Sequence, residues 1–310
     1  MVRHLLKISD FTKTECEKVI ENAIDIKKKP DKYTESLKGE TLLMLFEKPS
    51  LRTRISFETG MQQLGGHAIF YSIIDSPLGQ KENIHDTAKV ASRFINIIAA
   101  RVFKRQDVWD LAKYSDVPVI NMLDDYAHPC QMIGDFLTIK EKKGKLSDLK
   151  MAYYGDARNN VTYDLMRFCA LFGLKMDVAC PKSIDYTPEQ EVLEEVKQLA
   201  KSSGAIINVI HDAIKAAEDA DIIYTDSWMS YGIPKEKEEQ RKNVFKPFQV
   251  NSQIMKTAKK DAIFMNCLPA MRGYEQTAEV IDGPQSIVFD QAENRLHGQK
   301  AIMLFLREKF

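Results

Sequence analysis

The sequence predicts an α/β protein with two domains, each a parallel sheet flanked by helices. Apolar, β-rich segments alternate with segments of helical periodicity over almost the whole chain, which is typical of strands joined by crossover helices. The chain has 310 residues, and a single core usually stops growing near about 250 to 300 residues, so two cores are expected.

The expected strands fall into two sets, separated by a helix. The first set is TLLMLF, HAIFYS, INIIAAR and PVINM, and the second is KMAYYG, KMDVAC, AIINVI, DIIYT and AIFMN. A helix that starts near His128 should end at Gly144, because glycine favours the conformation that closes a helix. We therefore place the first domain at residues 1–143 and the second at 144–289. Residues 290–310 are expected to form an amphipathic helix that returns to the first domain.

Composition excludes several classes of protein. The 44 Lys and Arg balance the 44 Asp and Glu, and no long basic run appears, so a nucleic-acid partner is not expected. No apolar run is long enough to span a bilayer, and the N-terminal one is too short for a signal peptide, so we expect a cytoplasmic protein without a membrane partner. The five cysteines are odd in number and widely spaced, which disfavours disulfides and zinc sites.

Ligands of open parallel sheets bind beyond the carboxyl ends of the strands, so the residues after each strand carry the functional prediction. The first strand is followed by KPSLRTR, in which Ser50 can cap a helix whose inner side would include Ile55 and Phe57. The free N–H groups of that helix, with Arg52 and Arg54, would suit a phosphate. A capped surface helix with solvated arginines is the equally open alternative.

The third and fourth strands are also followed by polar residues. Arg101 ends the third strand, where a single arginine is more often a surface charge than a ligand contact. His128 and Gln131 follow the fourth strand and share a helix face, because they are three residues apart. Histidine can polarise a carbonyl and glutamine can accept from an amino group, so the two suit a carbamoyl group. Alternatively, His128 caps the helix and Gln131 is exposed.

The second set of strands has its own polar ends. The turn GDARNN lacks the glycine pattern of a dinucleotide site, and its Asn159 and Asn160 could bind a polar substrate or simply form the turn. Asp226, with Ser230 nearby, could hold a cationic amine. Cys267 directly follows a strand; such a cysteine is usually a buried small hydrophobe, but beside a carboxylate it could take part in proton transfer.

Six motifs in order, SLRTR, HPCQ, GDARNN, DSWMS, NCLPA and AENRLH, resemble those of the aspartate/ornithine carbamoyltransferase family. The resemblance extends from about Ile8 to the C-terminus, and the D-x-W-x-S and C-L-P elements are most similar to the ornithine branch. It implies a first domain for carbamoyl phosphate and a second for L-ornithine, with an active site in the cleft that is shared between the subunits of a homotrimer. The implied products are L-citrulline and phosphate, and no metal or organic cofactor is implied.

The resemblance also implies individual roles. The phosphate would be held by Ser50, Leu51, Arg52 and Thr53, with Lys81 as a further contact. The carbamoyl group would be held by Arg101, His128, Gln131, Cys267, Leu268 and Arg295. Ornithine would be held by Asn160, Asp226, Ser230 and Tyr231. The residues expected to act in catalysis are Cys267, Arg101, His128 and Asp226.

Two departures from the family pattern affect the phosphate site. Leu51 replaces a threonine, which removes a hydroxyl but keeps the main-chain N–H. Pro77 stands where the ornithine branch has a glutamine that reaches into the neighbouring subunit, and Gln80 or Lys81 could take its place. These changes leave open a non-catalytic, anion-binding relative.

Two other departures affect the acceptor. Tyr231 stands where the ornithine branch has methionine, and Asn266 stands where it has histidine. They leave open a carbamoyltransferase that acts on another amine such as putrescine, which lacks the α-amino and α-carboxylate groups of ornithine.

Overall fold

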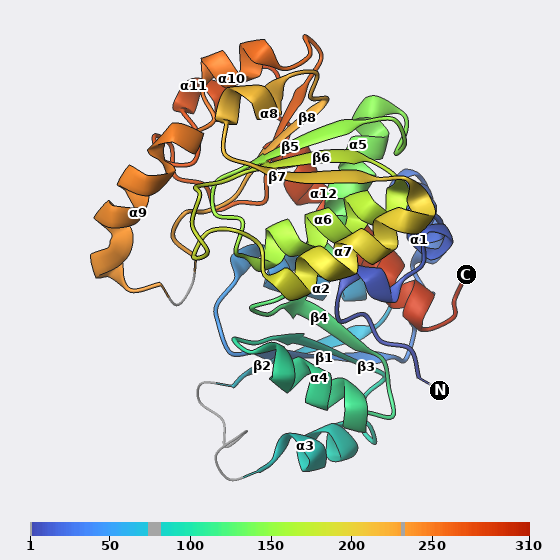
Figure 1. The fold of residues 1–310 in the computed structure, drawn as a ribbon. Coiled ribbons are helices and arrows are strands. Elements are labelled where there is room, and N and C mark those ends of the chain that lie inside the picture. The colour runs from blue at the N-terminus through green and yellow to red at the C-terminus, as the bar shows by residue number, and fades with distance from the viewer. Residues whose placement is uncertain (1, 74–81, 231–232) are drawn as a thin grey trace. The chain divides into compact units, whose positions relative to one another are not determined.

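The computed structural model describes residues 2–73, 82–230 and 233–310 (Figure 1). The chain divides into two compact units, one formed by Met1–Lys142 with Glu293–Phe310 and the other by Lys143–Ala292. Each unit contains a parallel sheet flanked by helices, which confirms the predicted fold class.

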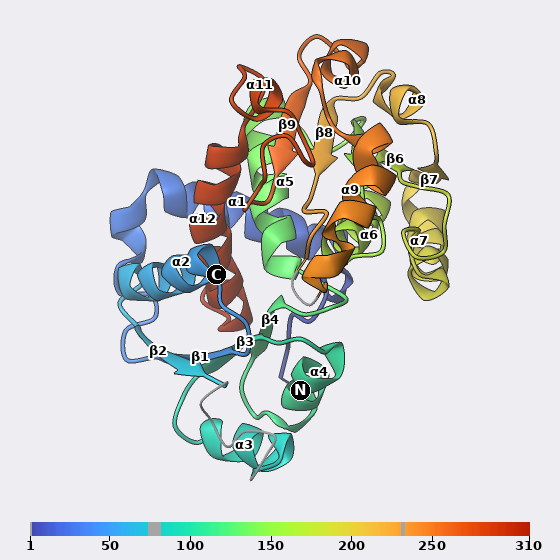
Figure 2. The same cartoon turned by 90° about the vertical axis from the view of Figure 1, so that its left-hand side faces the viewer.

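The sheet of the first unit has the strand order β2-β1-β3-β4. Its strands match the four predicted runs and are β1 (Thr41–Phe46), β2 (His67–Ser72), β3 (Ile97–Arg101) and β4 (Val119–Leu123). Helices α3 (Ile84–Ala91) and α4 (Arg105–Tyr114) pack on one face through apolar side chains that include Ala88, Val108 and Leu111. On the other side lie α2 (Leu51–Gln63), α5 (Pro129–Lys143) and α12 (Val288–Leu306) (Figure 2).

Helix α12 returns the end of the chain to the first unit, as predicted. The expectation of an amphipathic helix is only partly right, because residues 298–304 are all buried. Gly298 allows this close packing: a Cβ atom there would lie 3.0 Å from Cγ2 of Ile133 on α5. Polar residues on this helix are therefore placed to act inside the protein.

The sheet of the second unit has the strand order β7-β6-β5-β8-β9. Its strands match the second predicted set and are β5 (Lys150–Tyr154), β6 (Lys175–Ala179), β7 (Ile206–Ile210), β8 (Ile222–Thr225) and β9 (Ile263–Asn266). One face is covered by α6 (Asn160–Phe172) and α7 (Gln190–Ser203). The other packs against α8 (Ala213–Ala217), α10 (Ser252–Thr257) and α11 (Ala278–Ile281).

The remaining helices are α1 (Lys13–Lys28), α9 (Glu238–Phe245) and the 3-10 turns η1 (Ile8–Asp10), η2 (Pro30–Tyr33), η3 (Lys235–Lys237) and η4 (Lys246–Phe248). Within the described ranges, no helix combines the length and apolar character needed to cross a bilayer. All five cysteines are free thiols.

Strand order determines where ligands can bind. In the first sheet, β2 is added on one side of β1, and β3 and β4 are added on the other side. In the second sheet, β6 and β7 are added on one side of β5, and β8 and β9 on the other. The strand order therefore reverses between β1 and β3 and between β5 and β8, which creates a switch point at each place. The predicted site residues after these strands therefore lie at the two places where such folds bind ligands.

Candidate active site

The turn after β1 presents the start of α2. Ser50 is the N-cap: its Oγ accepts from the N–H of Thr53 at 3.4 Å, which confirms the predicted cap. Among the described residues, the N–H groups of Leu51 and Arg52 have no acceptor, and the Leu51 side chain is 71% exposed. These two N–H groups remain available to an anion.

The predicted inner side of α2 was wrong at Ile55, which is 52% exposed. Thr53, Phe57 and Met61 form the buried face, with the three-to-four-residue spacing of a helix. Ile55 lies two residues from Phe57, about 200° around the helix, and therefore points away from the core.

The two arginines of this turn have different surroundings. Arg54 donates to Oε1 of Glu58 at 3.0 Å, and its guanidinium lies 3.7 Å from the centre of the Phe70 ring. In the part of the chain that the structure describes, the guanidinium of Arg52 has no hydrogen-bond or ion-pair partner, and the residue is partly exposed. Arg52 is therefore the arginine that can bind an anion at this helix start.

A buried guanidinium connects α2, α5 and α12. Nη1 of Arg295 donates to Oε1 of Gln131 at 2.6 Å, and Nη2 donates to Oγ1 of Thr53 at 3.1 Å. Nε2 of Gln131 donates in turn to Oδ1 of Asp135 at 2.7 Å, which fixes the orientation of the amide. The structure thus brings three predicted site residues together, and Asp135, which was not predicted, holds one of them.

Arg101 is buried at the end of β3, with 5% exposure, so it is not an ordinary surface charge. Its carbonyl oxygen accepts from the N–H of Glu47 at 2.9 Å, which joins the ends of β1 and β3. The pairing with β4 shifts between Ala100 and Arg101, and such a bulge reorients the side chain that follows it.

His128 lies in the turn between β4 and α5. Asp124 shapes this turn: its Oδ1 accepts from the N–H groups of Tyr126 at 2.7 Å and Ala127 at 2.6 Å. Burial, followed by the positive charges of Arg295 and other nearby cations, holds the pKa of His128 well below its usual range. The imidazole is therefore neutral at pH 7 and can hydrogen-bond to a substrate carbonyl.

Lys48 is a candidate that sequence reasoning missed. Its side chain is buried two residues before Ser50, and its Nζ lies 4.9 Å from the centre of the Phe103 ring. Burial and the charge of Arg101 lower its pKa to about 8. The signal that could have identified it is a lysine at the carboxyl end of a central strand, next to the cap.

In the second unit, Asp226 and Cys267 form a hydrogen-bonded pair. They follow β8 and β9, and the thiol donates from Sγ to Oδ1 of Asp226 at 3.0 Å. Burial raises the pKa of Asp226, while the bonds from Cys267 and from the N–H of Ser227 oppose this rise. The thiol therefore lies beside a carboxylate, which is the condition under which it could take part in proton transfer.

The turn after Cys267 has an unusual backbone. Leu268 has φ of 55°, a region that side-chain-bearing residues rarely adopt, and it precedes a cis peptide bond to Pro269. Oδ1 of Asn266 accepts from the N–H of Leu268 at 2.8 Å, and Nδ2 donates to Oε1 of Gln276 at 3.2 Å. Asn266 therefore uses its amide to build this turn.

The two asparagines of GDARNN have separate roles. Asn159 caps α6: its Oδ1 accepts from the N–H of Thr162 at 2.8 Å, and its Nδ2 donates to the carbonyl of Asp156 at 2.6 Å. Asn160 is the first helical residue and is partly exposed, as is Ser230 after β8. Asn159 thus forms the turn, while Asn160 and Ser230 remain candidates for the substrate. The predicted contacts Lys81 and Tyr231 lie outside the described residues, as do Pro77 and Gln80.

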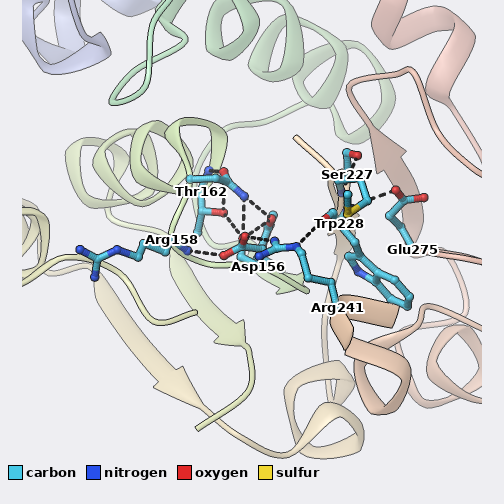
Figure 3. Close-up of polar contacts among 10 residues, drawn as sticks. Asp156, Arg158, Thr162, Ser227, Trp228, Arg241 and Glu275 are labelled. Atoms are coloured by element: carbon cyan, nitrogen blue, oxygen red, sulfur yellow. Dashed lines mark hydrogen bonds and ion pairs between the residues drawn. The ribbon is translucent and has the colours of Figure 1, made fainter. Parts of the chain in front are cut away.

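Three buried charges that were not predicted surround Trp228 (Figure 3). Nη2 of Arg241 pairs with Oδ2 of Asp156, and Nε of Arg241 donates to the carbonyl of Trp228 at 2.6 Å. The N–H of Trp228 donates to Oε1 of Glu275 at 3.2 Å. These contacts could not be predicted from the sequence, because Asp156, Arg241 and Glu275 lie in separate segments of the chain.

Family models match both halves of the chain. Residues 3–141 match the domain described as "Aspartate/ornithine carbamoyltransferase, carbamoyl-P binding domain". Residues 147–306 match "Aspartate/ornithine carbamoyltransferase, Asp/Orn binding domain". The protein therefore belongs to the aspartate/ornithine carbamoyltransferase family, as its motifs indicated.

Individual relatives narrow the comparison to the ornithine branch. The chain is 50% identical over 303 residues to the "Ornithine carbamoyltransferase" of Thermococcus kodakarensis, covering 97% of this chain and 95% of the relative. It is 48% identical to the "Ornithine carbamoyltransferase, anabolic" of Pyrococcus furiosus, with the same shares covered. Its fold is similar to the ornithine transcarbamoylase of Giardia lamblia, with a TM-score of 0.91, 45% identity and 99% of each chain covered.

The shifted pKa of Lys48 predicts a pH-dependent affinity for carbamoyl phosphate. Below pH 8 the ammonium is charged and attracts the phosphate; as pH rises through about 8 it loses its proton, so affinity should fall. Lys48→Arg stays charged and should keep its affinity above pH 8, whereas Lys48→Met should be weak at both pH values. Titration calorimetry with the stable analogue phosphonoacetamide at pH 7 and 9.5 measures this.

The ligand also changes its ionisation between the two pH values. Because all variants are compared at the same pH, this change affects each measured affinity equally. A wild-type affinity that follows Lys48→Arg at pH 9.5 would show that Lys48 keeps its proton at that pH, and a Lys48→Met affinity equal to wild type at pH 7 would show that Lys48 does not interact with the anion.

Proposed function

We propose that this protein transfers the carbamoyl group of carbamoyl phosphate to the δ-amine of L-ornithine, giving L-citrulline and phosphate. The observation that carries the proposal is that the two candidate sites of this family member contain charges of opposite sign. The first unit gathers the buried cations Lys48, Arg101 and Arg295 near His128, and the second buries Asp226 against a thiol. The ornithine-specific names of the relatives support the choice of acceptor.

In this proposal, the first turn of α2 binds the phosphate. The N–H groups of Leu51 and Arg52 point out of the positive end of the helix, and the Arg52 guanidinium adds charge-assisted hydrogen bonds. The hydroxyls of Ser50 and Thr53, which are 3.0 Å apart, complete the donors.

The carbamoyl group is assigned to Arg101, His128, Gln131 and Arg295. When the amine attacks, the carbonyl oxygen becomes an oxyanion, and fixed donors aimed at it lower the barrier. Arg101 and neutral His128 provide such donors. Oε1 of Gln131 accepts from Arg295 and retains a lone pair for the carbamoyl amino group. The resemblance adds Cys267 and Leu268 to these contacts.

The amine is assigned to the second unit. The δ-amine must lose a proton to attack, because only the neutral form has a free electron pair. Asp226 and Cys267 favour the placement and deprotonation of this amine, while Asn160, Ser230 and Tyr231 bind the rest of the amino acid. A C–N bond then forms, the C–O bond to phosphate breaks, and the second proton that the nitrogen gives up passes to the leaving phosphate.

We also propose that the enzyme is a cytoplasmic homotrimer with shared active sites. Its five free thiols fit a reducing compartment. Apolar side chains are exposed on α2, where Ile55 is 52% exposed, and on edge strand β2, where Ile69 and Tyr71 are 41% and 40% exposed. Exposed apolar side chains on an edge strand commonly mark an interface.

The assembly predicts that Ile55→Asp reduces the oligomeric mass and the activity together, because an exposed isoleucine tolerates aspartate in a monomer but not in an apolar interface. Light scattering coupled to size exclusion measures the mass. Phe94→Asp is the matched control: Phe94 is also exposed, but it lies beyond α3 and outside α2 and β2, so it should not change the mass. A monomeric wild type, or an unchanged mass for Ile55→Asp, would contradict this assembly.

The assignment of the phosphate site predicts unequal effects of two neighbouring arginines. Arg52→Ala should lower kcat/KM for carbamoyl phosphate by about 100-fold or more, the effect of losing one preorganised charged donor. Arg54→Ala should have a much smaller effect, because Arg54 already contacts Glu58 and Phe70. Citrulline formation by the purified proteins measures both. Equal losses would refute the assignment, and an inactive wild type would favour the non-catalytic alternative.

The choice of acceptor predicts that L-ornithine is used in preference to putrescine and L-lysine. The amide of Asn266 is engaged in its own turn, so this departure does not itself create a putrescine site. One extra methylene in L-lysine should cost about 10- to 200-fold in kcat/KM. Phosphate release measured with each amine tests this, and equal or faster turnover of putrescine would overturn the ornithine assignment.

A further inference from the structure

The main chain of Trp228 is held from both ends by buried charges of opposite sign. Its N–H donates to Oε1 of Glu275 at 3.2 Å, and its carbonyl accepts from Nε of Arg241 at 2.6 Å. Glu275 follows β9 and Arg241 lies on α9, so the two contacts come from different segments of the second unit. We call Asp156, Arg241 and Glu275 the Trp228 clamp.

Arg241 connects this main chain to a third segment. Its Nη2 pairs with Asp156, which follows β5 and also accepts from the N–H of Arg158 at 2.9 Å (Figure 3). Arg241 and Asp156 are only 8% and 6% exposed. The guanidinium also lies 4.9 Å from the centre of the Phe245 ring and 5.4 Å from that of Tyr186, so its plane is fixed on several sides.

Glu275 makes the corresponding connection on the other side. Its Oε2 accepts from the N–H of Met271 at 3.0 Å, while Oε1 accepts from Trp228. The Glu275 side chain, which is 1% exposed, thus accepts from two main-chain N–H groups. One of them lies after β8, and the other lies in the turn after Cys267. Burial raises the pKa of Glu275, and these main-chain bonds oppose the rise.

The indole of Trp228 adds a steric constraint. It is buried and packs on Phe245 with ring centres 5.7 Å apart. A Cβ atom at Gly155 would lie 3.1 Å from Nε1 of Trp228, and Gly155 has φ of 119°, which favours glycine. The base of the GDARNN turn and the tryptophan therefore fit closely against each other.

The clamp holds a segment with substrate-facing candidates on both sides of it. Asp226 lies two residues before Trp228, and Ser230 lies two residues after it. The bond from Cys267 to Asp226, at 3.0 Å, requires the ends of β8 and β9 to stay in register, and buried Glu275 accepts from a main-chain N–H group in each of the two loops that follow these strands.

We propose that Arg241 and Glu275 are positioning residues for the carbamoyl acceptor: they hold the Trp228 main chain so that Asp226 meets Cys267 and Ser230 keeps its place. This proposal rests on the proposed function. A displacement of about 1 Å at a reacting group can cost about 100-fold in rate. Burying the charges of Arg241 and Glu275 costs desolvation free energy, whereas apolar side chains could hold a loop without that cost. Their presence therefore favours a role in fixing the position of the Trp228 main chain.

The test uses Arg241→Met, the conservative Arg241→Lys and Glu275→Gln in the full-length protein. Arg241→Met should lower kcat/KM for ornithine by about 100-fold and leave phosphonoacetamide affinity unchanged, because only the acceptor side is displaced. Arg241→Lys keeps the charge and one donor, so it should recover part of the loss. Glu275→Gln keeps one acceptor and should be intermediate.

Arg158→Met is the matched control. Arg158 lies in the same turn, but its guanidinium contacts the surface residue Glu189 at 3.2 Å and should not affect turnover. The chain has two tryptophans, so Trp228 is the only one left in a Trp109→Phe background. Its emission should shift to longer wavelength in Arg241→Met and not in Arg158→Met.

Each outcome is decisive. Wild-type ornithine kinetics in Arg241→Met, or equal losses for both substrates, would overturn the proposal in favour of a purely structural role. If Arg241→Met does not fold, judged by circular dichroism, Arg241→Lys and Glu275→Gln apply the same criterion. Failure of the proposed function is distinct: the wild type would then make no citrulline, whereas failure of the clamp leaves the wild type active.

Discussion

The buried guanidinium of Arg295 is the interaction on which the first candidate site depends. It donates to Thr53 in the first turn of α2 and to Gln131 in the first turn of α5. These helices start at the ends of different strands. The shared donor Arg295 fixes the position of one helix start relative to the other. Thr53 and Arg295 are 242 residues apart in sequence, so this part of the site forms only when the end of the chain has returned to the first unit.

The two units place opposite charges in low-dielectric surroundings. In the first unit, burial lowers the pKa values of His128 and Lys48, so the permanent positive charge is supplied by arginines, which do not release their protons. In the second unit, burial raises the pKa values of Asp226 and Glu275. The first arrangement suits a phosphate and a polarised carbonyl, and the second suits an amine that must give up a proton.

Sequence predicted those features that depend on neighbouring residues. All nine strands and the Ser50 cap follow from local periodicity and from the short-range geometry of helix starts. Family motifs indicated Asp226 and Cys267, but their contact depends on the pairing of β8 with β9. The different surroundings of Arg52 and Arg54 could have been anticipated only in part, since Glu58 lies one turn from Arg54 but Phe70 belongs to another element.

Features missed by sequence reasoning depend on tertiary contacts. The Asp156–Arg241 pair joins residues 85 positions apart, and no local pattern marks either as buried. Helix α12 shows the same effect near its start: Oε1 of Gln291 accepts from the N–H of Asn266 at 3.0 Å, directly before Cys267, and Arg295 binds Thr53 and Gln131. One helical turn in sequence thus supports polar turns of both units. Since the buried polar side chains of Gln291 and Arg295 must be satisfied by specific partners, they constrain the geometry of each site more strongly than apolar side chains could.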